Sequence, residues 1–560
     1  MIKIRRHIGR YTLLFSITTF ALLLCSSSSI KLASAHGERF YFPSDLPACN
    51  ARTMVCMEGV ATFGPASETV ANVAPASFAP SIPQNEHNCV DGAGIPKSCF
   101  DIGPFEYMPQ NLMLQKGGLG AAQKLSAIGE TPCVDGQAEA PDSTFPCSNV
   151  DLLAFMPLNE IGGGIGNDIW GWTAPDGGEY VIMGRRNGTS FVYISDPTNP
   201  VYLGDLPTED GITSLWRDLK VYNNHAFIVV DDSVRTTRSH GMQVFDLTQL
   251  VDAATNTAAL PISFTTTAVY KEIDAAHNIA INETSGFAYI VGSRHAPEDA
   301  MKCAGGLHMV DITTPTAPTF AGCFGGDGYT HDTQCVIYDG PDTAYQDREI
   351  CFNSNEDSLT IVDVTIKNSP AQIAKAYYRN FCEEGDEGDC NNNGGFLPAF
   401  YTHQGWLTED HTYFVQNDEL DEFSLGINTN TYMWNVQDLD NPKYIGNYTA
   451  KLESIDHNLY IKDQYIYAAN YSSGLRILDA SNIAAASLTE IAYFDTYPAD
   501  NAVNYDGAWS SYPFFESGVV PVSTIREGLF LLRPTLTRAP GTVEPPPTDG
   551  VKIYMPVIRQ

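Results

Sequence analysis

The sequence predicts an all-β fold, a seven-bladed β-propeller closed by an N-terminal strand and preceded by a cysteine-rich N-terminal extension. Glycine (46 residues), proline (34) and aromatic residues (11%) are plentiful, which suits many short strands joined by turns. Apolar and polar residues alternate in many segments, and no long segment has helical periodicity. A unit of about 50 residues with three or four short strands recurs along the chain, and this period is typical of propeller blades.

Each repeating unit starts with an Asp or a His, followed by a short apolar strand, a tight turn and a strand rich in Tyr, Phe, Ile and Val. A Gly then precedes a strand that ends in Asp. We attribute the longest interval between units to an insertion over 381–398. The seven units begin near Asp168, Asp218, His277, His331, His403, His457 and Gly507, at intervals of 50, 59, 54, 72, 54 and 50 residues.

The last unit ends near Pro534 without a fourth strand, and the segment Val150–Phe155, just before the first unit, has the pattern of that missing strand. We therefore expect the propeller to span 150–534 and the N-terminal strand to complete the last blade. Ring closure of this kind removes a sheet edge that would otherwise be exposed to aggregation. A cysteine-rich region, 36–149, precedes the ring, and a Pro-rich linker with a short tail, 535–560, follows it.

Residues 1–35 have the layout of a secretory signal peptide: a basic start, an apolar run over 11–24, and Ala33-Ser34-Ala35 as a cleavage site. The apolar run is shorter than the roughly 20 residues that a membrane span needs, so we expect a secreted or cell-surface protein without a transmembrane span. The net charge is −34, and removal of the five basic residues within 1–35 leaves −39. Such acidity excludes nucleic acid as a partner and disfavours anionic membranes.

Twelve cysteines follow residue 35, and an even number favours disulfides in an exported protein. The sequence leaves their connectivity open, but pairing of sequence neighbours is the simplest assignment. A zinc site is disfavoured because the chain has no CxxC pair. The neighbouring pairs are Cys49–Cys56, Cys89–Cys99, Cys133–Cys147, Cys303–Cys323, Cys335–Cys351 and Cys382–Cys390.

The repeat places a polar side chain at the start of six units. If the strand that follows each one is the innermost strand of its blade, these side chains approach the central channel at one end. Imidazole and carboxylate groups together can bind zinc, copper, iron or nickel. The competing interpretation is structural, because a polar residue at a blade start often hydrogen-bonds a turn of the neighbouring blade. The candidate ring consists of Asp168, Asp218, His277, His331, His403 and His457.

Two acidic segments are candidates for calcium, which binds six to eight oxygen atoms. Neither has EF-hand spacing, and a solvated acidic loop is the competing interpretation. The first segment contains Glu383, Glu384, Asp386, Glu387 and Asp389, and the second contains Asp418, Glu419, Asp421 and Glu422. The aspartates that end a strand in several units are expected to be structural turn residues; they are Asp246, Asp311, Asp363 and Asp479.

The chain lacks the GxSxG, HExxH and P-loop motifs, so no nucleophile or phosphate site stands out. Two hypotheses follow. The first is an exported binding or scaffold module that contacts extracellular protein or glycan. The second is a metal-dependent enzyme, a hydrolase or lyase, with a His/Asp site at the mouth of the propeller channel. Propellers host both classes of function, so the fold does not decide between them.

Six segments of the chain share motifs with a known family: 214–218, 240–247, 330–335, 401–407, 455–460 and 473–479, the last of which reads Ser473-Gly474-Leu475-Arg476-Ile477-Leu478-Asp479. These segments resemble the choice-of-anchor B family, whose propeller contains LVIVD repeats, and the resemblance covers about residues 133–533. It implies an exported bacterial protein, in a family whose members carry differing C-terminal attachment signals, and it implies no established activity. The tail here resembles neither a sortase motif nor a hydrophobic helix with a basic stop.

Overall fold

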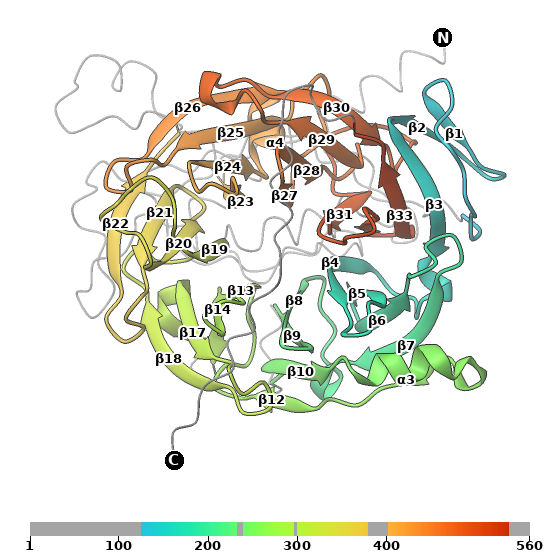
Figure 1. Ribbon diagram of the computed structural model, residues 1–560, viewed down its shortest axis with the longest axis horizontal. Helices are drawn as coiled ribbons and strands as arrows, with labels where there is room; N and C mark the ends of the chain where they lie inside the picture. The colour runs from blue at the N-terminus through green and yellow to red at the C-terminus, as the bar shows by residue number, and fades with distance from the viewer. Residues whose placement is uncertain (1–124, 232–238, 296–299, 379–400, 537–560) are drawn as a thin grey trace, which may run out of the picture. The chain divides into compact units, whose positions relative to one another are not determined.

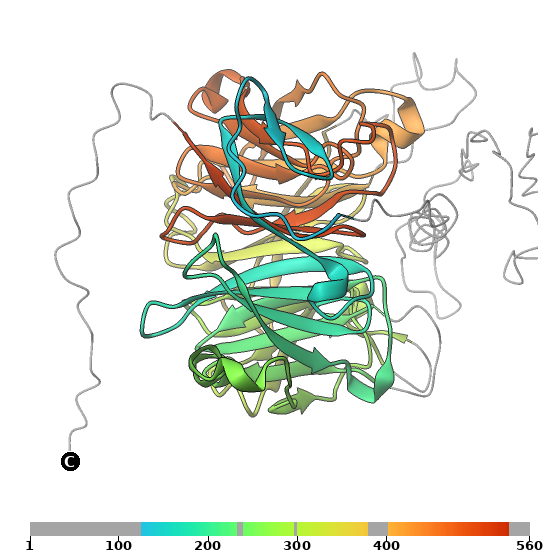
Figure 2. The ribbon, with the colours of Figure 1, turned by 90° about the vertical axis from the view of Figure 1, so that its right-hand side faces the viewer.

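Seven antiparallel blades form a ring around a central channel in the computed structural model, which describes residues 125–231, 239–295, 300–378 and 401–536 (Figures 1 and 2). All these residues belong to one compact unit of the chain. In six blades the first strand in chain order lies innermost, whereas in the closing blade the N-terminal strand lies outermost; the innermost strands of neighbouring blades contact one another. The predicted all-β, seven-bladed propeller is confirmed.

The blades are numbered here in chain order and their strands are given from the inner strand outward. Blade 1 contains β4 (Gly166–Thr173), β5 (Glu179–Arg185), β6 (Gly188–Tyr193), β7 (Val201–Pro207) and the short parallel strand β11 (Ile262–Ser263). Blade 2 contains β8 (Arg217–Tyr222), β9 (His225–Val230), β10 (Met242–Asp246) and β12 (Ala268–Tyr270). Blade 3 contains β13 (Asn278–Asn282), β14 (Phe287–Val291), β17 (Leu307–Asp311) and β18 (Thr319–Phe324).

The second half of the ring repeats this order. Blade 4 contains β19 (Asp332–Ile337), β20 (Glu349–Ser354), β21 (Leu359–Asp363) and β22 (Ala371–Ala376), and blade 5 contains β23 (Thr402–Leu407), β24 (Tyr413–Asp418), β25 (Asn430–Asn435) and β26 (Lys443–Thr449). Blade 6 contains β27 (Leu459–Lys462), β28 (Tyr465–Ala469), β29 (Leu475–Asp479) and β30 (Thr489–Phe494). Blade 7 contains β31 (Ala508–Ser511), β32 (Val520–Thr524), β33 (Gly528–Pro534) and β3 (Val150–Pro157).

Short elements lie in the connections between strands. The helices are α3 (Gln249–Thr255) and α4 (Asp421–Leu425), with single 3-10 turns at Leu158–Glu160, Glu209–Gly211, Thr257–Ala259, Lys302–Gly305 and Ile483–Ala485. A two-stranded ribbon, β15 (Arg294–His295) with β16 (Ala300–Met301), projects from blade 3. Among the described residues, no helix has the length and hydropathy that would carry it across a bilayer.

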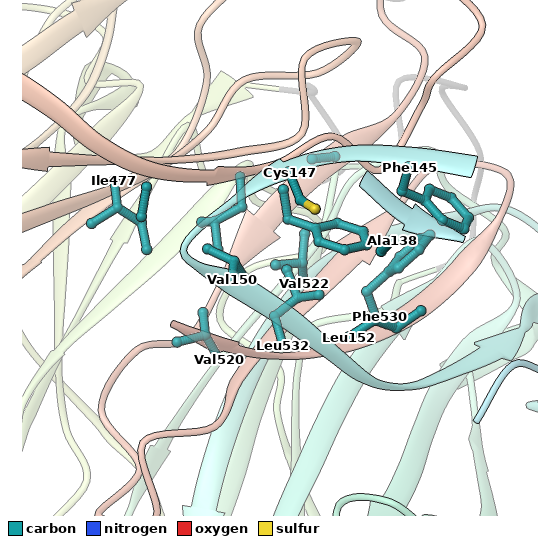
Figure 3. Close-up of a cluster of buried hydrophobic side chains, with 14 of the residues drawn as sticks. Ala138, Phe145, Cys147, Val150, Leu152, Ile477, Val520, Val522, Phe530 and Leu532 are labelled. Atoms are coloured by element: carbon teal, nitrogen blue, oxygen red, sulfur yellow. The ribbon is translucent and has the colours of Figure 1, made fainter. Parts of the chain in front are cut away.

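The ring is closed by β3, as the sequence predicts. This strand pairs antiparallel with β33, from Val150 opposite Pro534 to Pro157 opposite Gly528. Apolar side chains from both ends of the chain, among them Val150, Leu152, Phe530 and Leu532, belong to one buried cluster (Figure 3). The Phe155 and Phe530 rings lie 4.5 Å apart between centroids. Burial of this shared core ties the first strand of the propeller to the last one.

The sheet extends beyond the expected start of the propeller at residue 150. A hairpin of β1 (Gln137–Glu139) and β2 (Thr144–Ser148) adds to the outer edge of blade 6, where Cys147 lies opposite Phe494. Phe145 stacks on Phe494 with 5.5 Å between ring centroids and belongs to the core cluster behind β3. The end of the cysteine-rich region is therefore part of the propeller and covers an outer strand edge.

The strand-end aspartates are turn residues, as the sequence predicts. Asp246 accepts hydrogen bonds from the backbone amide and the hydroxyl of Thr248, at 3.0 and 2.7 Å. Asp311 and Thr313 repeat this arrangement at 2.9 and 2.6 Å. The side chain replaces backbone partners at the point where the chain leaves the sheet. Part of the acidity of the chain thus comes from a structural residue that recurs around the ring.

Three of the predicted disulfides lie in the described residues, and all three are present: Cys133–Cys147, Cys303–Cys323 and Cys335–Cys351. The other three predicted pairs lie outside the described residues, as do the signal peptide and the C-terminal tail. Each observed bridge joins cysteines separated by 14 to 20 residues. The local pairing inferred from sequence neighbours is confirmed for these six cysteines.

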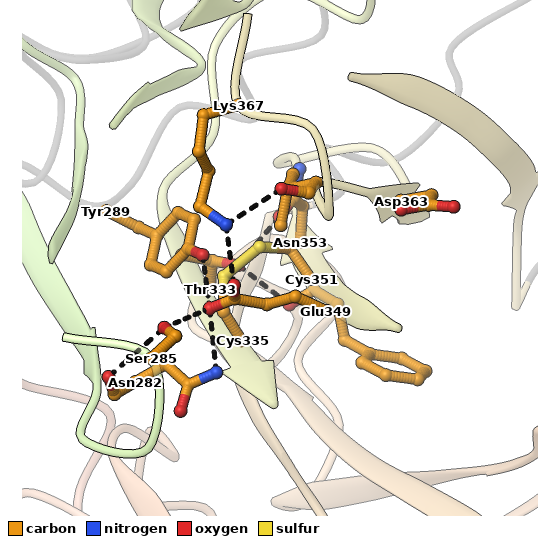
Figure 4. The surroundings of a disulfide bond; sticks show 12 residues. Asn282, Ser285, Tyr289, Thr333, Cys335, Glu349, Cys351, Asn353, Asp363 and Lys367 are labelled. Carbon is orange, nitrogen blue, oxygen red and sulfur yellow. Dashed lines mark hydrogen bonds and ion pairs between the residues drawn. A yellow bond between two sulfur atoms is a disulfide. The ribbon is translucent and has the colours of Figure 1, made fainter. Parts of the chain in front are cut away.

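The Cys335–Cys351 bridge joins β19 to β20 next to a buried polar network (Figure 4). Glu349, on β20, accepts hydrogen bonds from the Tyr289 hydroxyl at 2.6 Å and forms an ion pair with Lys367 at 2.5 Å. Because Tyr289 belongs to blade 3, this carboxylate links two adjacent blades. Its charge is balanced by Lys367, so the network needs no further cation.

Candidate metal centre in the central channel

The six candidate ring residues all line one cavity in the central channel. They come from blades 1 to 6, on the inner strand or just before it. The space around these residues that no atom fills is about 620 Å³ and includes open solvent, so the cavity itself has room for only a few water molecules. The repeat therefore brings the whole predicted set together, namely Asp168, Asp218, His277, His331, His403 and His457.

Two of the histidines, His277 and His331, are hydrogen-bonded to each other, with 2.8 Å between their Nε2 atoms. Nδ1 of His331 lies 2.8 Å from the backbone oxygen of His403, and Nδ1 of His277 lies 3.0 Å from Oδ2 of Asp231. A carbonyl oxygen and an ionised carboxylate only accept hydrogen bonds, so both Nδ1 atoms donate. One more proton must then lie between the Nε2 atoms, and the pair carries one positive charge.

Asp231 balances this charge from just beyond the end of β9. Burial would raise the pKa of the Asp231 carboxyl, but Arg294 and His277 outweigh burial and hold that pKa below its usual value. Arg294 lies 3.3 Å from Oδ1 of Asp231. The nitrogen atoms of His277 and His331 are thus occupied by protons and hydrogen bonds, which makes them poor metal ligands.

His403 and His457 form a different arrangement with Glu419, a residue just past the end of β24. Nε2 of His403 is 3.7 Å from Oε2 of Glu419, and Nε2 of His457 is 3.8 Å from Oε1. These separations are too long for hydrogen bonds. They are close to the distance of about 3.3 Å between two ligands of one tetrahedral zinc ion. The three side chains are buried, and one ligand atom from each lies within 4.8 Å of the others.

Protonation and orientation also suit these side chains to a metal ion. Burial holds the pKa of His403 well below its usual value and lowers the pKa of His457 to about 3, so both rings are neutral. Nδ1 of His457 donates to the backbone oxygen of Trp509 at 2.5 Å, which leaves the lone pair on Nε2. Nδ1 of His403 is buried and has no hydrogen-bond partner among the described residues.

Glu419 carries the charge of this group. Burial raises the pKa of its carboxyl to about 7, against a hydrogen bond from the Tyr471 hydroxyl that lowers it. The Tyr471 oxygen lies 2.5 Å from Oε1 of Glu419 and orients the carboxylate toward the channel. A cation beside Glu419 would favour its ionised form.

A second part of the cavity wall is formed by Asp168, Asp218, Lys220 and Asp332. Lys220 lies 2.6 Å from Oδ1 of Asp218 and 3.1 Å from Oδ2 of Asp168. Burial opposes the charge on Lys220, but the two carboxylates outweigh it and raise the pKa of the amine. Burial raises the pKa of Asp332 to about 7. In this part of the cavity wall, the positive charge of Lys220 balances negative charge on the neighbouring carboxylates.

Aromatic rings from four blades meet across the channel, toward the carboxyl ends of the inner strands. Trp170 of blade 1 lies 5.7 Å from Tyr460 of blade 6, and Trp406 of blade 5 lies 5.0 Å from Tyr460. Phe514, which follows the inner strand of blade 7, lies 6.2 Å from both tryptophans. Because these blades are not all neighbours, the contacts pass over the channel. We call this group the aromatic layer; its members are Trp170, Trp406, Tyr460, Tyr512 and Phe514.

The acidic segment at 418–422 is buried, so its interpretation as a solvated loop is wrong. The exposed fractions of Asp418, Glu419, Asp421 and Glu422 do not exceed 4%. The segment leads from β24 into α4 and packs beneath tyrosines; Tyr378 and Tyr432 donate to Asp418 and Asp421. The other acidic segment lies outside the described residues; it comprises Glu383, Glu384, Asp386, Glu387 and Asp389, between Cys382 and Cys390.

Sequence reasoning did not single out Lys220 or Asp231, and it named Glu419 only within the acidic segment considered for calcium. Lys220 and Glu419 line the channel cavity, and Asp231 pairs with His277. Lys220 lies two residues after Asp218 on one strand, and period-two alternation could have placed both on the same face. Asp231 and Glu419 occupy equivalent positions, directly after the second strand of blades 2 and 5. In an antiparallel hairpin this position lies beside the start of the inner strand, where the ring residues are.

Comparisons with known proteins identify one repeat in the chain. Residues 457–496, which form most of blade 6, match the LVIVD repeat. No curated protein matches the sequence. Among solved structures, a functionally unknown protein from Desulfotomaculum acetoxidans is 11% identical, with a TM-score of 0.40 over 67% of this chain and 98% of that chain. A periplasmic gluconolactonase from Pseudomonas aeruginosa is 10% identical, with a TM-score of 0.39 over 68% and 96%. The Cps50 (Swd1) β-propeller domain from Myceliophteria thermophila is also 10% identical, with a TM-score of 0.38 over 64% and 94%.

Proposed function

We propose that this protein is a β-propeller that binds a transition-metal ion of the zinc type in its central channel through His403, Glu419 and His457. The observation that carries the proposal is the convergence of these three buried ligand atoms within 4.8 Å. The donor set of two neutral imidazoles and one carboxylate is common in catalytic zinc sites. Nothing else in the described part of the chain supplies a comparable set of nitrogen donors, since His277 and His331 are hydrogen-bonded to each other.

A metal ion bound in this way supplies Lewis acidity and lowers the pKa of a coordinated water. Residues of the chain hold the ligand side chains in position. His457 is held in one tautomer by the Trp509 carbonyl, and Glu419 is oriented by Tyr471. Lys220 and its carboxylates provide polar groups on another part of the same cavity wall. We therefore infer hydrolytic or lyase chemistry at this centre.

Elemental analysis tests the metal site. The full chain purified without chelator should hold close to one zinc-type ion, and His403→Ala or His457→Ala should lose it. His225→Ala is a matched control, because His225 lies at a hairpin, is not among the residues that line the cavity, and has its Nδ1 atom 2.8 Å from the Asn223 carbonyl. Unchanged occupancy in the His403→Ala/His457→Ala double variant would remove the proposal, provided that its circular dichroism matches the wild type.

A second candidate function is binding of extracellular glycan, and the aromatic layer favours it. Trp170, Trp406, Tyr512 and Phe514 are each only partly buried, although they contact one another in the channel. Partly exposed aromatic faces are common contact surfaces for the apolar side of sugar rings. Under this function the propeller is a binding or scaffold module. Glycan-array binding that is lost in Trp406→Ala but kept in His403→Ala would support it over the metal-dependent activity.

We further propose that the protein is exported and belongs with the choice-of-anchor B proteins. The support is the layout of residues 1–35, the LVIVD repeat at 457–496 and the disulfides, which form in oxidising compartments. N-terminal sequencing of the protein from an expressing bacterium should find a chain that starts after Ala35. A chain that keeps residues 1–35 in the cytoplasm would contradict export.

A further inference from the structure

The disulfides of the described residues differ in their exposure to solvent. Two of the three bridges contain a fully buried cysteine, since Cys147 and Cys351 are each 0% exposed. In the third bridge, Cys323 is exposed on β18, the outer strand of blade 3, and Cys303 is half-buried. A thiol in solution can therefore approach this bridge from the Cys323 side.

A buried histidine lies beside the exposed bridge. His308, on β17, is 2% exposed and lies opposite Cys323 in the register of β17 and β18. Its Nδ1 atom is 3.7 Å from Sγ of Cys303. This is a hydrogen-bond distance for the large sulfur atom, which is a weak acceptor. One side chain thus touches the half-buried sulfur of a bridge whose other sulfur belongs to an exposed residue.

The direction of this hydrogen bond follows from the partners of His308. A disulfide sulfur carries no proton, so Nδ1 of His308 must donate to Cys303. Burial lowers the pKa of His308 to about 4, so the ring is neutral and Nε2 keeps its lone pair. The Tyr270 hydroxyl lies 2.9 Å from Nε2, and burial raises the pKa of this hydroxyl, which therefore donates. The hydrogen bonds run from Tyr270 through His308 to Cys303.

Packing holds the His308 ring in this orientation. The ring lies between Tyr270 of blade 2 and Phe320 of blade 3, with 5.8 and 5.0 Å between ring centroids. A donor that already points at the sulfur needs no rearrangement when charge develops on that sulfur.

The backbone at Cys303 favours opening of the bridge. Cys303 and its neighbour Ala304 both have left-handed backbone conformations, with φ of 53° and 55°. This conformation is unfavourable for residues with a Cβ atom. The bridge to β18 constrains this turn, so opening the bridge allows the backbone to relax.

We propose that Cys303–Cys323 is an exchangeable disulfide that reacts with thiols of low molecular weight, with His308 as its catalytic residue and Tyr270 as a positioning residue. An external thiolate bonds to Sγ of Cys323, the S–S bond breaks, and its electron pair goes to Sγ of Cys303. The Nδ1–H group of His308 stabilises this leaving thiolate, and a more stable leaving thiolate departs faster.

A second external thiolate completes the reaction. It attacks the mixed disulfide at the external sulfur, and Cys323 leaves as a thiolate. Two thiols are thereby oxidised to one external disulfide, and the protein bridge gains two electrons. The protons of the two thiols pass through solvent to the protein sulfurs. None of these steps needs a metal ion in the channel, so the proposal can fail or stand independently of the channel centre.

Thiol exchange on the native full chain tests the proposal. The protein is incubated with millimolar free cysteine, quenched with an alkylating reagent and mapped by peptide mass spectrometry. We expect Cys303–Cys323 to open at least about tenfold faster than Cys335–Cys351, which is the buried internal control. Opening of Cys303–Cys323 at the rate of Cys335–Cys351, or more slowly, would overturn the proposal.

Variants of His308 test its role. His308→Phe keeps an aromatic ring between Tyr270 and Phe320 but removes the N–H donor, and it should slow opening of Cys303–Cys323 about tenfold. His308→Asn places an amide N–H close to the position of Nδ1 and should recover most of the rate. An unchanged rate in His308→Phe would remove His308 from the reaction. If a variant loosens the fold, the internal control bridge also opens faster, and the wild-type rates then decide.

Nitrogen NMR of His308 tests the role of Tyr270. In the wild type the spectrum should show a protonated Nδ1 and a bare Nε2. Tyr270→Phe removes only the hydroxyl, and it should weaken this tautomer preference and slow the exchange while leaving the internal control bridge unchanged. A wild-type ring that is protonated at Nε2 would contradict the hydrogen bond to Cys303 and overturn the proposed mechanism.

Discussion

Two equivalent places in the ring use the same pair of residue types in different ways. In blades 2 and 3, Asp231 follows the second strand and pairs at 3.0 Å with His277 at the start of the next blade. In blades 5 and 6, Glu419 occupies the same position, but it lies 3.8 Å from His457. Asp231 also pairs with Arg294, and His277 is hydrogen-bonded to His331; we call Asp231 and His277 the closed pair. The facing ligand atoms of Glu419 and His457 are too far apart for a hydrogen bond, and we call these two residues the open pair.

The difference shows how a repeat can separate structure from function. A carboxylate and a histidine at these positions form a stable buried pair when a cation such as Arg294 balances the carboxylate and both nitrogen atoms of the histidine are hydrogen-bonded. Glu419 and His457 have the Tyr471 hydroxyl and the Trp509 carbonyl as partners instead, so their facing ligand atoms become a candidate site for a cation. The closed pair should therefore matter for stability and the open pair for binding.

The largest effect is expected from breaking the closed pair. Asp231→Asn leaves Arg294 and the protonated His277–His331 pair buried without their counter-charge, and we expect a loss of roughly 3 kcal/mol in the free energy of unfolding. Urea unfolding measures it. Zinc binding should be unchanged in the folded fraction. A loss below about 0.5 kcal/mol would show that the pair is not a structural contact.

The open pair should respond in the opposite way. Zinc at a hundredfold excess over its dissociation constant should stabilise the wild type by about 2.7 kcal/mol. Glu419→Gln should abolish most of this gain, and in the absence of zinc it should leave stability equal or higher, because a buried charge is removed. Thermal unfolding with and without zinc measures both quantities. Equal zinc stabilisation of wild type and variant would place the ion elsewhere.

The pH dependence of zinc affinity sharpens the comparison. Glu419 must lose its proton to bind, and burial raises its pKa to about 7 in the metal-free protein. As pH falls below 7, affinity should therefore fall by up to tenfold per pH unit, about 1.4 kcal/mol. His457 adds nothing over this range, since its pKa is lowered to about 3. Titration calorimetry at pH 5.5 to 8 measures the slope; a flat profile would exclude Glu419 as a ligand.

The smallest effect is expected at a residue outside both pairs. Asp479 accepts a hydrogen bond from the backbone amide of Ser481 at 2.8 Å where the third strand of blade 6 ends. Asp479→Ala should cost about 1 kcal/mol of stability and leave zinc binding unchanged. Parallel unfolding and binding measurements check this, and any change in metal content would mean that strand-end aspartates do more than close turns.

Most of the fold was accessible from the sequence because it is encoded locally and repeatedly. The period of about 50 residues, the alternation within strands and the missing fourth strand predict the ring and its closure by β3. The disulfides that are observed join near neighbours, so short spacing was sufficient to pair them. The ring residues were also accessible, because one repeat position maps onto one place around the channel.

The candidate site was only partly accessible, because its chemistry depends on contacts between blades. Sequence places His331 and His403 in equivalent positions, yet His331 shares a proton with His277 while His403 faces Glu419. Nothing in the linear pattern distinguishes the two. The same holds for Glu419, which sequence groups with the acidic run at 418–422 and not with the histidines.

The sequence by itself determined the repeat, the ring and which polar side chains approach the channel, since strand periodicity and turn residues act over a few neighbours. Only the tertiary structure decided which of those side chains are fully engaged in hydrogen bonds and ion pairs, and which have ligand atoms that could still bind a cation. That decision depends on partners such as Arg294 and Trp509, which reach Asp231 and His457 from distant parts of the chain. Tertiary packing also buried the acidic segment at 418–422, where Tyr378 and Tyr432 donate hydrogen bonds to Asp418 and Asp421, and it placed Glu419 of this segment beside His403 and His457.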